Sequence, residues 1–508
     1  MDMRDDCKRT WCLIFFLLIC KAERASEPAD SVVRPPAVAG KFYPEDAKKL
    51  QAAVKGFLED ALPPRGERPV ALVVPHAGYP YSGQIAADAY RQAMGYDYDV
   101  VVVLGTNHTV PPFDSVSVFQ GRGVATPLGV ATVDQPLAQA LMASGFTYKP
   151  EAHAKEHSEE VQIPFIQVAF PRAKVVTAIV GTPDLGVATR FGQALAKALE
   201  DRKALVVASS DLSHFPRHGE AVAADRTTLE AVAGLDPQAV VSAIKRQMQA
   251  ERPGLETCAC GEGAILAAMV AAKAMGARRG VVLSYANSGD SLVGDWDRVV
   301  GYGSVMFTAA PGGTDTKVLE AAEAPRGGAL TEADKAALLK LARSTVERYL
   351  TTGTFPLPRT SSPALRSMQG AFVTIKKKGD LRGCIGHMAE DMPLAQAVGR
   401  MALAAAFEDT RFSPVRADEL ASLEYEISVL TPMKPAPGVG SIVVGRDGVV
   451  IQKGGRSAVF LPQVAPEQGW SREEMLDHLC EKAGLDAGCW RSGCKFLTFQ
   501  AIVFGEKK

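Results

Sequence analysis

The feature that most constrains this chain is a series of short apolar runs that alternate with amphipathic stretches between residues 31 and 308. The runs have strand length and lie at Val70–Val74, Val100–Leu104, Lys174–Val180, Leu205–Ala208 and Val281–Tyr285. The stretches between them have helical spacing and lie near 46–60, 134–144, 185–200, 220–233, 236–249 and 262–276. A strand whose side chains are apolar on both faces needs a cover on each face. The pattern therefore predicts an α/β fold with a central, mostly parallel sheet flanked by helices.

The second half of the chain has a different pattern. Residues 309–329 are rich in Ala, Gly, Pro and charge and have no apolar period, which predicts a linker. A helix is expected to begin after Thr331, with Asp334 completing a capping box. Strands are predicted at Ala371–Lys376, Leu381–Ile385, Leu423–Leu430, Val443–Gln452, Ser457–Leu461 and Lys495–Phe504, and helices at Pro393–Glu408 and Ser471–Ala483. Residues 330–508 thus read as an α+β domain with a mostly antiparallel sheet, after a first domain at 32–308.

Charge excludes one class of partner. The 508 residues include 56 basic and 57 acidic side chains, and the net charge is -1. Nucleic-acid binding needs a concentrated basic surface, and the one short basic run, Lys376–Lys378, is followed by Gly379 and Asp380. That run predicts a solvated hairpin turn, and no nucleic-acid partner is expected.

The first 31 residues have the layout of a secretory signal. A basic start precedes the apolar block Trp11–Cys20, and small residues follow it. The block is short for a spanning helix, so contact with a membrane is expected only through an uncleaved leader. The chain is therefore predicted to be exported or anchored in the inner membrane, and a cytoplasmic location is the alternative.

The nine cysteines have irregular spacing, which argues against a disulfide framework. Cys480, Cys489 and Cys494 lack the paired CxxC knuckles of a structural zinc site. They are predicted to be buried or half-buried free thiols.

Histidines gather where the apolar runs of the first domain end. Four of the chain's eight, His76, His108, His157 and His214, occur in such positions. In parallel sheets ligands gather at the carboxyl ends of strands, and imidazole is both a common metal ligand and the usual acid or base near neutral pH. The polar loop 286–298 is expected at the same edge. We therefore predict a metal or acid–base site there.

Two further histidines, His153 and His218, are predicted to be exposed and outside this site.

Asp211 and Cys260 are candidates to complete the site. Two neutral imidazoles and one anion form a minimal set for a redox or Lewis-acid metal. A carboxylate as the anion would resemble a facial triad, whereas the Cys260 thiolate would suit iron or copper better than magnesium. The alternatives stay open: Asp211 can cap the following turn instead of orienting His214, and Cys260 can be a small core residue.

The second domain contains the segment LRGCIGH, with Arg382, Cys384 and His387. Glycines beside a cysteine, with Arg and His nearby, can expose the thiol and lower its pKa. Arg382 can equally hold an anion by a bidentate contact. A buried Cys384 on a tightly packed strand is the structural alternative.

Residues 32–308 resemble the Memo family. The resemblance is carried by VRPPAVAGKFYP, VPHAGYPYSG, LGTNH, HSEEVQIPF, SSDLSHF, CACGEGAI and SYANSGD. Memo proteins in turn resemble class III (LigB-type) extradiol dioxygenases, which hold non-haem iron. The resemblance implies His76, His108 and Cys260 as metal ligands and His214 as the acid–base residue. Those dioxygenases use a carboxylate where this chain has Cys260, so a redox or metal-handling role is at least as strong an expectation as ring cleavage.

Residues 330–505 resemble the AMMECR-type domain through LRGCIGH, FEDTRFSPV and LEYEISVL. This resemblance implies a fold without a reaction. Memo and AMMECR-type modules are associated in prokaryotes with a radical-SAM protein, and the chain itself lacks a CxxxCxxC cluster motif. Such an enzyme is expected as a separate partner.

Three functions follow from these patterns. The first is a non-haem metal oxidoreductase acting on an unknown small molecule. It would use Fe(II), or Cu as the second choice, with His214, Asp211 and His157 in catalytic roles. The second is an adaptor that binds phosphopeptides or proteins through loops around His76 and Tyr79–Tyr81. The third is metal-independent hydrolysis with Cys260 or Cys384 as nucleophile.

Overall fold

The computed structural model describes residues 32–319 and 328–506. The predicted leader, residues 1–31, lies outside the described residues, as does the linker segment 320–327. Within the described ranges, no helix has both the length and the apolar character needed to cross a membrane.

A seven-stranded sheet forms the centre of the first domain, as the apolar runs predict. Its strands, in spatial order, are β4 (Val116–Val118), β7 (Lys174–Val180), β3 (Val100–Thr106), β8 (Ala204–Ser209), β2 (Pro69–Val74), β10 (Gly301–Thr308) and β9 (Arg279–Asn287). The four strands from β7 to β2 are parallel, while β4 and β10 are antiparallel to their neighbours. Because β9 pairs antiparallel with β10, its carboxyl end lies at the same edge as that of β2.

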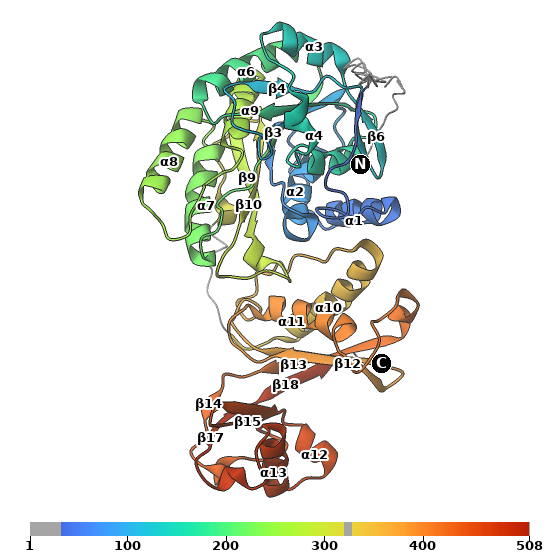
Figure 1. The fold of residues 1–508 in the computed structure, drawn as a ribbon, viewed down its shortest axis with the longest axis vertical. Helices are drawn as coiled ribbons and strands as arrows, with labels where there is room; N and C mark the ends of the chain where they lie inside the picture. The colour runs from blue at the N-terminus through green and yellow to red at the C-terminus, as the bar shows by residue number, and fades with distance from the viewer. Residues whose placement is uncertain (1–31, 320–327, 507–508) are drawn as a thin grey trace, which may run out of the picture.

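Helices cover both faces of this sheet. They are α1 (Ala47–Glu59), α2 (Tyr79–Ala93), α3 (Gln135–Ala143), α4 (Pro150–Ala154), α5 (Ile163–Ala169), α6 (Leu185–Ala198), α7 (His218–Ala233), α8 (Pro237–Gln249) and α9 (Glu262–Ala274). Figure 1 shows α7 and α8 on one side of β9 and β10, and α1 and α2 on the other. A small sheet of β1 (Val33–Arg34), β5 (Gly123–Thr126) and β6 (Gly129–Thr132) lies beside this core. Because helices cover both faces of the sheet, its strands are apolar on both faces and do not alternate between apolar and polar side chains.

Helix α2 corrects the prediction of an exposed loop at Tyr79–Tyr81. The helix begins at Tyr79, directly after the PHAG segment, and the Tyr79 side chain is buried. The hydroxyl of Tyr79 donates a hydrogen bond to the carbonyl of Val161 at 2.8 Å. Pro and Gly around the aromatic residues favour a loop in the sequence, but Pro80 fits the first turn of a helix, where its missing N–H is not needed.

The C-terminal part is α+β and contains two antiparallel sheets. The first has the order β12 (Asp380–His387), β11 (Ala371–Lys377), β13 (Leu423–Leu430) and β18 (Ala501–Gly505), with α10 (Glu332–Thr352) and α11 (Leu394–Phe407) packed on it. The second has the order β14 (Lys434–Pro435), β17 (Lys495–Phe499), β15 (Gly448–Lys453) and β16 (Arg456–Phe460), with α12 (Val464–Gln468) and α13 (Arg472–Lys482). Each sheet forms a small core with its helices, and a third buried cluster, Leu430, Val450 and Phe499, joins residues of both sheets.

Local signals in this part are confirmed at two positions. Thr331 and Asp334 form the predicted capping box at the start of α10. The turn between β11 and β12 uses left-handed backbone at Lys378 (φ 55°) and Gly379 (φ 90°), which matches the predicted hairpin.

Two predicted strands are wrong in extent. The segment Lys495–Phe504 is not one strand: β17 and β18 belong to different sheets and are separated at Gln500. Strand β15 begins at Gly448 and not at Val443, because the Asp447 carboxylate accepts a hydrogen bond from the Val443 amide and closes a turn.

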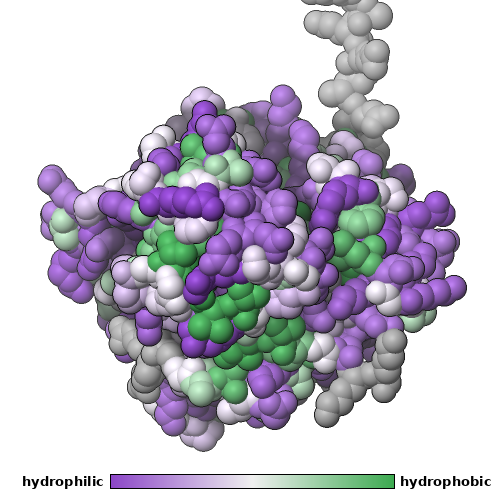
Figure 2. Space-filling model, turned by 90° about the horizontal axis from the view of Figure 1, so that it is seen from below, coloured by the Kyte–Doolittle hydropathy of each residue, from purple (hydrophilic) through white to green (hydrophobic). Residues whose placement is uncertain are grey.

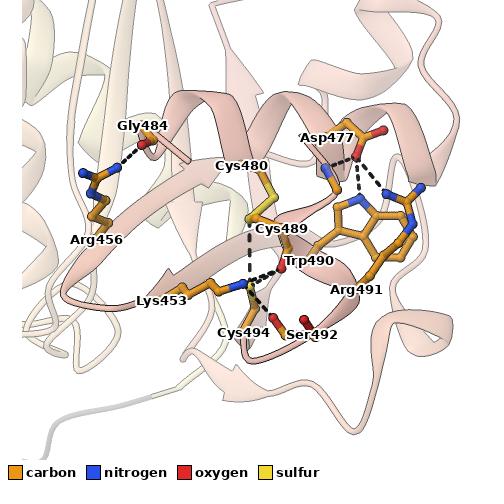
Figure 3. The surroundings of a disulfide bond; sticks show 11 residues. Lys453, Arg456, Asp477, Cys480, Gly484, Cys489, Trp490, Arg491, Ser492 and Cys494 are labelled. Carbon is orange, nitrogen blue, oxygen red and sulfur yellow. Dashed lines mark hydrogen bonds and ion pairs between the residues drawn. A yellow bond between two sulfur atoms is a disulfide. The ribbon is translucent and has the colours of Figure 1, made fainter. Parts of the chain in front are cut away.

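The prediction of free thiols is wrong for Cys480 and Cys489, which form a disulfide between α13 and the short helix at Cys489–Arg491 (Figure 3). Cys494 remains free, and its sulfur lies 3.9 Å from that of Cys489. Around the bond, Lys453 donates to the carbonyls of Cys489 (3.0 Å) and Ser492 (2.8 Å). Spacing along the chain did not indicate this pair because the loop that follows α13 folds back onto the helix.

The two domains contact each other through both polar and apolar groups, among them Leu357, which packs against Ile85, Ala286 and Tyr302. Arg348 of α10 pairs with Asp60 at the end of α1, and Arg359 pairs with the buried Asp88 of α2. The Gln396 amide of α11 reaches the loop between β9 and β10. Figure 1 shows the C-terminal part below the first domain, beside the ends of β9 and β10.

Figure 2 shows the molecule from below the view of Figure 1, from the side of the C-terminal part. This face is mostly hydrophilic, with hydrophobic side chains gathered near its centre.

Candidate metal centre and pocket

The ends of three neighbouring parallel strands bring the predicted histidines together. Strand β8 pairs with β2 on one side and β3 on the other, so Val74, Leu104 and Ser209 lie at one edge of the sheet. His76 follows β2 by two residues, and His108 follows β3 in the same way. The spatial convergence thus follows from the parallel register of the sheet.

Three imidazoles form the centre of the site, and we call His76, His108 and His157 the histidine cluster. One ligand nitrogen from each lies within 4.8 Å of the others, a spacing that fits a single metal ion. The ring centroids are 4.5 Å apart for His108 and His157, 5.2 Å for His76 and His108, and 5.3 Å for His76 and His157. Sequence patterns placed all three in one site but gave His157 a catalytic role, whereas its position matches that of a ligand.

Glu156 orients the cluster and was not identified from the sequence. Its carboxylate accepts hydrogen bonds from the backbone N–H of His108 (2.8 Å) and lies 2.9 Å from His108 Nδ1. It also accepts from the amides of His157 and Ser158, each at 2.9 Å. An N–H at Nδ1 that donates to this carboxylate leaves Nε2 of His108 free to bind a metal. Sequence offered no signal, because Glu156 reaches across 48 residues to His108.

The protonation states of these groups suit metal binding. Burial and the neighbouring His108 lower the pKa of His76 to about 3, and burial with His76 nearby lowers the pKa of His157 to about 4. Burial alone would raise the pKa of Glu156, but its contacts with His108, His157 and Ser158 outweigh burial and bring it to about 2. Near neutral pH, His76 and His157 are therefore uncharged and Glu156 is anionic, which is the state that a bound cation requires.

Cys260 lies beside this centre. Its sulfur is 3.2 Å from His76 Nε2, and burial raises the pKa of the thiol well above its usual range. The set of mutually close ligand atoms consists of the histidine cluster and does not include this sulfur. The predicted residues His76, His108 and Cys260 thus lie together, and His157 joins the two histidines in the set of mutually close ligand atoms. The raised pKa also weighs against Cys260 as a metal-independent nucleophile.

Asp211 and His214 follow β8 and lie on the pocket side of the cluster. The Asp211 carboxylate accepts hydrogen bonds from the amides of His76 (2.7 Å) and Ala77 (3.2 Å), so it fixes the backbone that presents His76. Burial raises the pKa of Asp211 and lowers that of His214. Among the described residues, buried Nε2 of His214 has no hydrogen-bond partner. A buried nitrogen in that condition, at the wall of a pocket, is suited to a bound ligand or proton transfer.

The HSEEVQIPF segment connects the strand ends beneath the cluster. The Ser158 hydroxyl donates to the Thr106 carbonyl (3.0 Å), and the Ser209 hydroxyl donates to the Ser158 carbonyl (2.6 Å). Gln162 donates to Ser209 (2.8 Å) and to the Pro75 carbonyl (2.9 Å). These bonds fix the ends of β2, β3 and β8 relative to one another, and this positions His76 and His108.

Glu160 anchors the same segment to the start of the first domain. Its fully buried carboxylate accepts hydrogen bonds from Arg34 (2.6 Å), the amides of Ala37 (2.7 Å) and Val38 (3.0 Å), and the hydroxyl of Tyr43 (2.6 Å). Arg34 also donates to the carbonyl of His153 (2.6 Å). The VRPPAVAGKFYP and HSEEVQIPF segments therefore form one buried network.

A pocket of ≈ 490 Å³ opens beside the cluster. It is lined by Phe42, Ala77, Gly78, Tyr81, His157, Asp211, His214, Phe215, Ser288, Val293, Gly294, Asp295, Arg298, Val300 and Tyr302. The Arg298 guanidinium lies 3.7 Å from the centre of the Phe215 ring at the rim. Aromatic walls with few polar groups are typical of small-molecule sites.

His153 and His218 both lie outside the histidine cluster, as predicted, but neither is exposed. His153 is buried and contacts Ser117 (2.9 Å) and the Glu159 carboxylate (3.0 Å), so it belongs to the core. His218 lies outside the cluster, but only 13% of its side chain is exposed, and it stacks on Trp296 at 3.9 Å.

The LRGCIGH segment forms β12, and its side chains are engaged within the domain. Arg382 makes a bidentate contact with Glu419 (3.1 and 2.9 Å), and the Cys384 sulfur accepts from the Thr374 hydroxyl at 3.3 Å. His387 lies 2.6 Å from Asp391. A Cβ at Gly383 would collide with the Ala405 carbonyl of α11, which explains that glycine by close packing. Anion binding by Arg382 and reactivity of Cys384 stay predictions.

The Arg382–Glu419 pair predicts acid sensitivity of the C-terminal domain. Hydrogen bonds from Arg382 and Lys377 lower the pKa of Glu419 to about 2, below its ordinary 4.5. A lowered folded-state pKa contributes stability above about pH 4.5 that is lost as the pH falls toward 2. We expect Glu419→Gln to lower the free energy of unfolding by about 2 kcal/mol at pH 7 and to make little difference at pH 2. Hydrogen exchange of β12 amides in urea measures this, and an equal difference at both pH values would contradict it.

Comparison with known proteins assigns both halves. Residues 34–306 match the family described as Memo-like protein, and residues 339–504 match AMMECR1. A MEMO1 family protein of Methanopyrus kandleri is 35% identical over 288 residues, which cover 54% of this chain and 98% of that protein. A MEMO1 family protein of Aquifex aeolicus is 35% identical over 277 residues, covering 54% of this chain and 99% of its own length.

Among solved structures, an uncharacterized protein of Pyrococcus horikoshii is 40% identical, covers 34% of this chain and 90% of its own, and has a TM-score of 0.32. The family match spans more than half of the chain and contains the histidine cluster, its Glu156 support and the pocket. The chain therefore belongs to the Memo family, and it carries an AMMECR1 domain fused after the Memo domain.

Proposed function

We propose that this chain is a non-haem metal protein with redox or dioxygenase-like chemistry on an unknown small molecule. The single observation that carries the proposal is the histidine cluster, with three ligand nitrogens within 4.8 Å next to a pocket. Imidazole ligands suit iron and copper, and iron is our first candidate, with copper second. His76, His108 and His157 would hold the ion, and Cys260 would lie next to it.

The chain's own residues have separable tasks in this proposal. A bound iron or copper ion would supply one-electron and O₂ chemistry. His214, whose buried Nε2 has no partner within the described residues, would hold or move a proton in the pocket. Asp211 keeps the backbone of His76 in place, and the aromatic side chains of the pocket exclude water from the substrate.

Metal analysis of the full-length protein tests the proposal. Protein purified anaerobically without chelator should contain about one iron or copper ion per chain, and anomalous scattering should place it among the three imidazoles. Zinc at full occupancy would keep the metal site but contradict the redox chemistry. Less than stoichiometric binding after reconstitution with Fe(II), Cu(I) and Zn(II) would contradict the proposal itself.

The second candidate function is an adaptor for phosphorylated peptides. Arg298, exposed at the rim and stacked on Phe215, is the observation that favours it, because guanidinium binds phosphate well. An adaptor should bind a phosphotyrosine peptide equally in excess chelator and lose that binding in Arg298→Ala. Loss of activity in chelator with no peptide binding would favour the metal enzyme.

The proposal extends to partner and compartment. The fusion of Memo and AMMECR1 domains is the reason to expect a separate radical-SAM protein as partner. When a tagged form of this chain is purified from its host, such an Fe–S protein should co-purify with it.

The Cys480–Cys489 disulfide favours an oxidising compartment and hence export. N-terminal sequencing of the mature protein checks whether the leader has been removed.

A further inference from the structure

The loop between β9 and β10 forms one wall of the pocket, and we call residues 288–300 the pocket loop. Five of its residues before Val300 line the cavity: Ser288, Val293, Gly294, Asp295 and Arg298. None of the cluster histidines lies on this loop. The loop therefore shapes the space beside the proposed metal without supplying its ligands.

The pocket loop is anchored to its own domain through Trp296. The Trp296 ring stacks on His218 of α7 with centroids 3.9 Å apart, and its Nε1 donates to the Gly289 carbonyl at 2.9 Å. His218 also contacts the Asp290 carboxylate at 2.9 Å. This anchor fixes the side of the loop that faces α7.

The other anchor comes from the C-terminal domain. Gln396 of α11 is buried, and its amide donates to the carbonyls of Gly289 (2.7 Å) and Ser291 (2.8 Å). Leu292, directly after Ser291, is fully buried and faces Gly399 one turn further along α11. A Cβ at Gly399 would lie 2.6 Å from Leu292 Cδ2, so an added methyl group there would displace the Leu292 side chain.

The two anchors meet at one atom. The Gly289 carbonyl accepts from both Trp296 and Gln396, so the position of the loop depends on both domains. The Ser291 carbonyl also accepts from the Gly294 amide at 3.1 Å, so removal of Gln396 would leave each of the two carbonyls with one donor inside the loop and would remove both bonds from the loop to α11. The loop would then reach water by moving away from α11.

We propose that α11 of the AMMECR1 domain, through Gln396 and Gly399, holds the pocket loop in place, so that the substrate pocket of the Memo domain has its shape only in the fused chain. Gln396 and Gly399 are positioning residues, since they act through the loop. The inference rests on the proposed function only where it calls the cavity a substrate pocket.

Hydrogen exchange on the metal-free, full-length protein tests the proposal. In Gln396→Met, which keeps the volume but has no donor, amides of residues 288–300 should exchange about tenfold faster, the effect of losing two buried hydrogen bonds. In Gly399→Ala, displacement of Leu292 should give the same local effect. Amides of α2 and β8 should be unchanged in both variants, which separates a loop effect from general loosening.

Arg348→Ala is the matched control. This variant removes a different contact between the domains, the ion pair of Arg348 in α10 with Asp60. Arg348 does not contact the pocket loop. Exchange of residues 288–300 should remain at the wild-type rate there. The proposal would be overturned if amides of residues 288–300 exchanged at the wild-type rate in both Gln396→Met and Gly399→Ala. It would also be overturned if Arg348→Ala raised their exchange rate as much as the α11 variants do.

Metal binding separates this inference from the proposed function. Because no cluster histidine lies on the loop, Gln396→Met and Gly399→Ala should bind Fe(II) or Zn(II) as tightly as the wild type. Loss of metal in these variants would mean that α11 supports the whole domain and would contradict a local role. If the wild type binds no metal, the exchange measurement still decides whether α11 holds the loop.

Discussion

Replacing His108 by Ala in the full-length protein is expected to lower metal affinity by at least about a hundredfold, because it removes one of the three proposed ligands and the imidazole nearest to the buried Glu156 carboxylate. His76→Ala and His157→Ala should do the same. Glu156→Gln keeps all three histidines but removes the carboxylate that contacts His108. It should lower metal affinity by about ten- to a hundredfold. Anaerobic competition titrations against a chelator of known affinity measure all four.

His478→Ala is the matched control for these variants. That imidazole is exposed on α13, far along the chain from the cluster, and its loss should leave the affinity unchanged. Cys260→Ser then decides between two ligand sets. If it abolishes binding while His157→Ala does not, the set implied by family resemblance is right and the three-histidine set is wrong.

Glu160→Ala is expected to destabilise the Memo domain by about 3 kcal/mol, because it removes the nearer of the two carboxylates beside the buried Arg34 guanidinium and leaves only Glu159, at 3.4 Å. The amides of Ala37 and Val38 and the Tyr43 hydroxyl lose their acceptor as well. Urea unfolding followed by hydrogen exchange of β2 and β3 amides measures the loss in this domain apart from the AMMECR1 domain.

Glu200→Ala, which removes an exposed carboxylate at the end of α6, provides the comparison and should change stability by no more than about 0.5 kcal/mol. The double variant Arg34→Met, Glu160→Leu should recover part of the loss, since it removes both charges together. A loss below about 1 kcal/mol in Glu160→Ala would show that the network contributes little to folding.

The central sheet could be predicted because its strands are uniform. Lys174–Val180 was read with both ends correct, since buried parallel strands require long β-branched runs that few other structures tolerate. Helix α2 was missed because Tyr79–Ala93 combines Gly, Pro and small residues and lies on the sheet without a simple apolar period. Tertiary packing against β2, β9 and β10 makes it a helix.

The candidate site divides in the same way. His76 and His108 were found because the carboxyl ends of parallel strands meet at one edge. The role of Glu156, the position of His157 among the ligands and the burial of His153 depend on contacts between segments that no spacing reveals. Gln396 is the clearest case, because it contacts carbonyls 105 and 107 residues away, in the other domain.

The sequence alone indicated the alternation of apolar strands and helices in the central sheet, the two-domain organisation to be expected, and the residue types from which a metal centre can be built. These follow from periodicity and local chemistry, which act over a few residues. Only the tertiary structure decided which side chains share an ion, which cysteines pair and which helix supports the pocket loop. Those outcomes depend on distances between remote segments, and such distances are set by the packing of the whole chain.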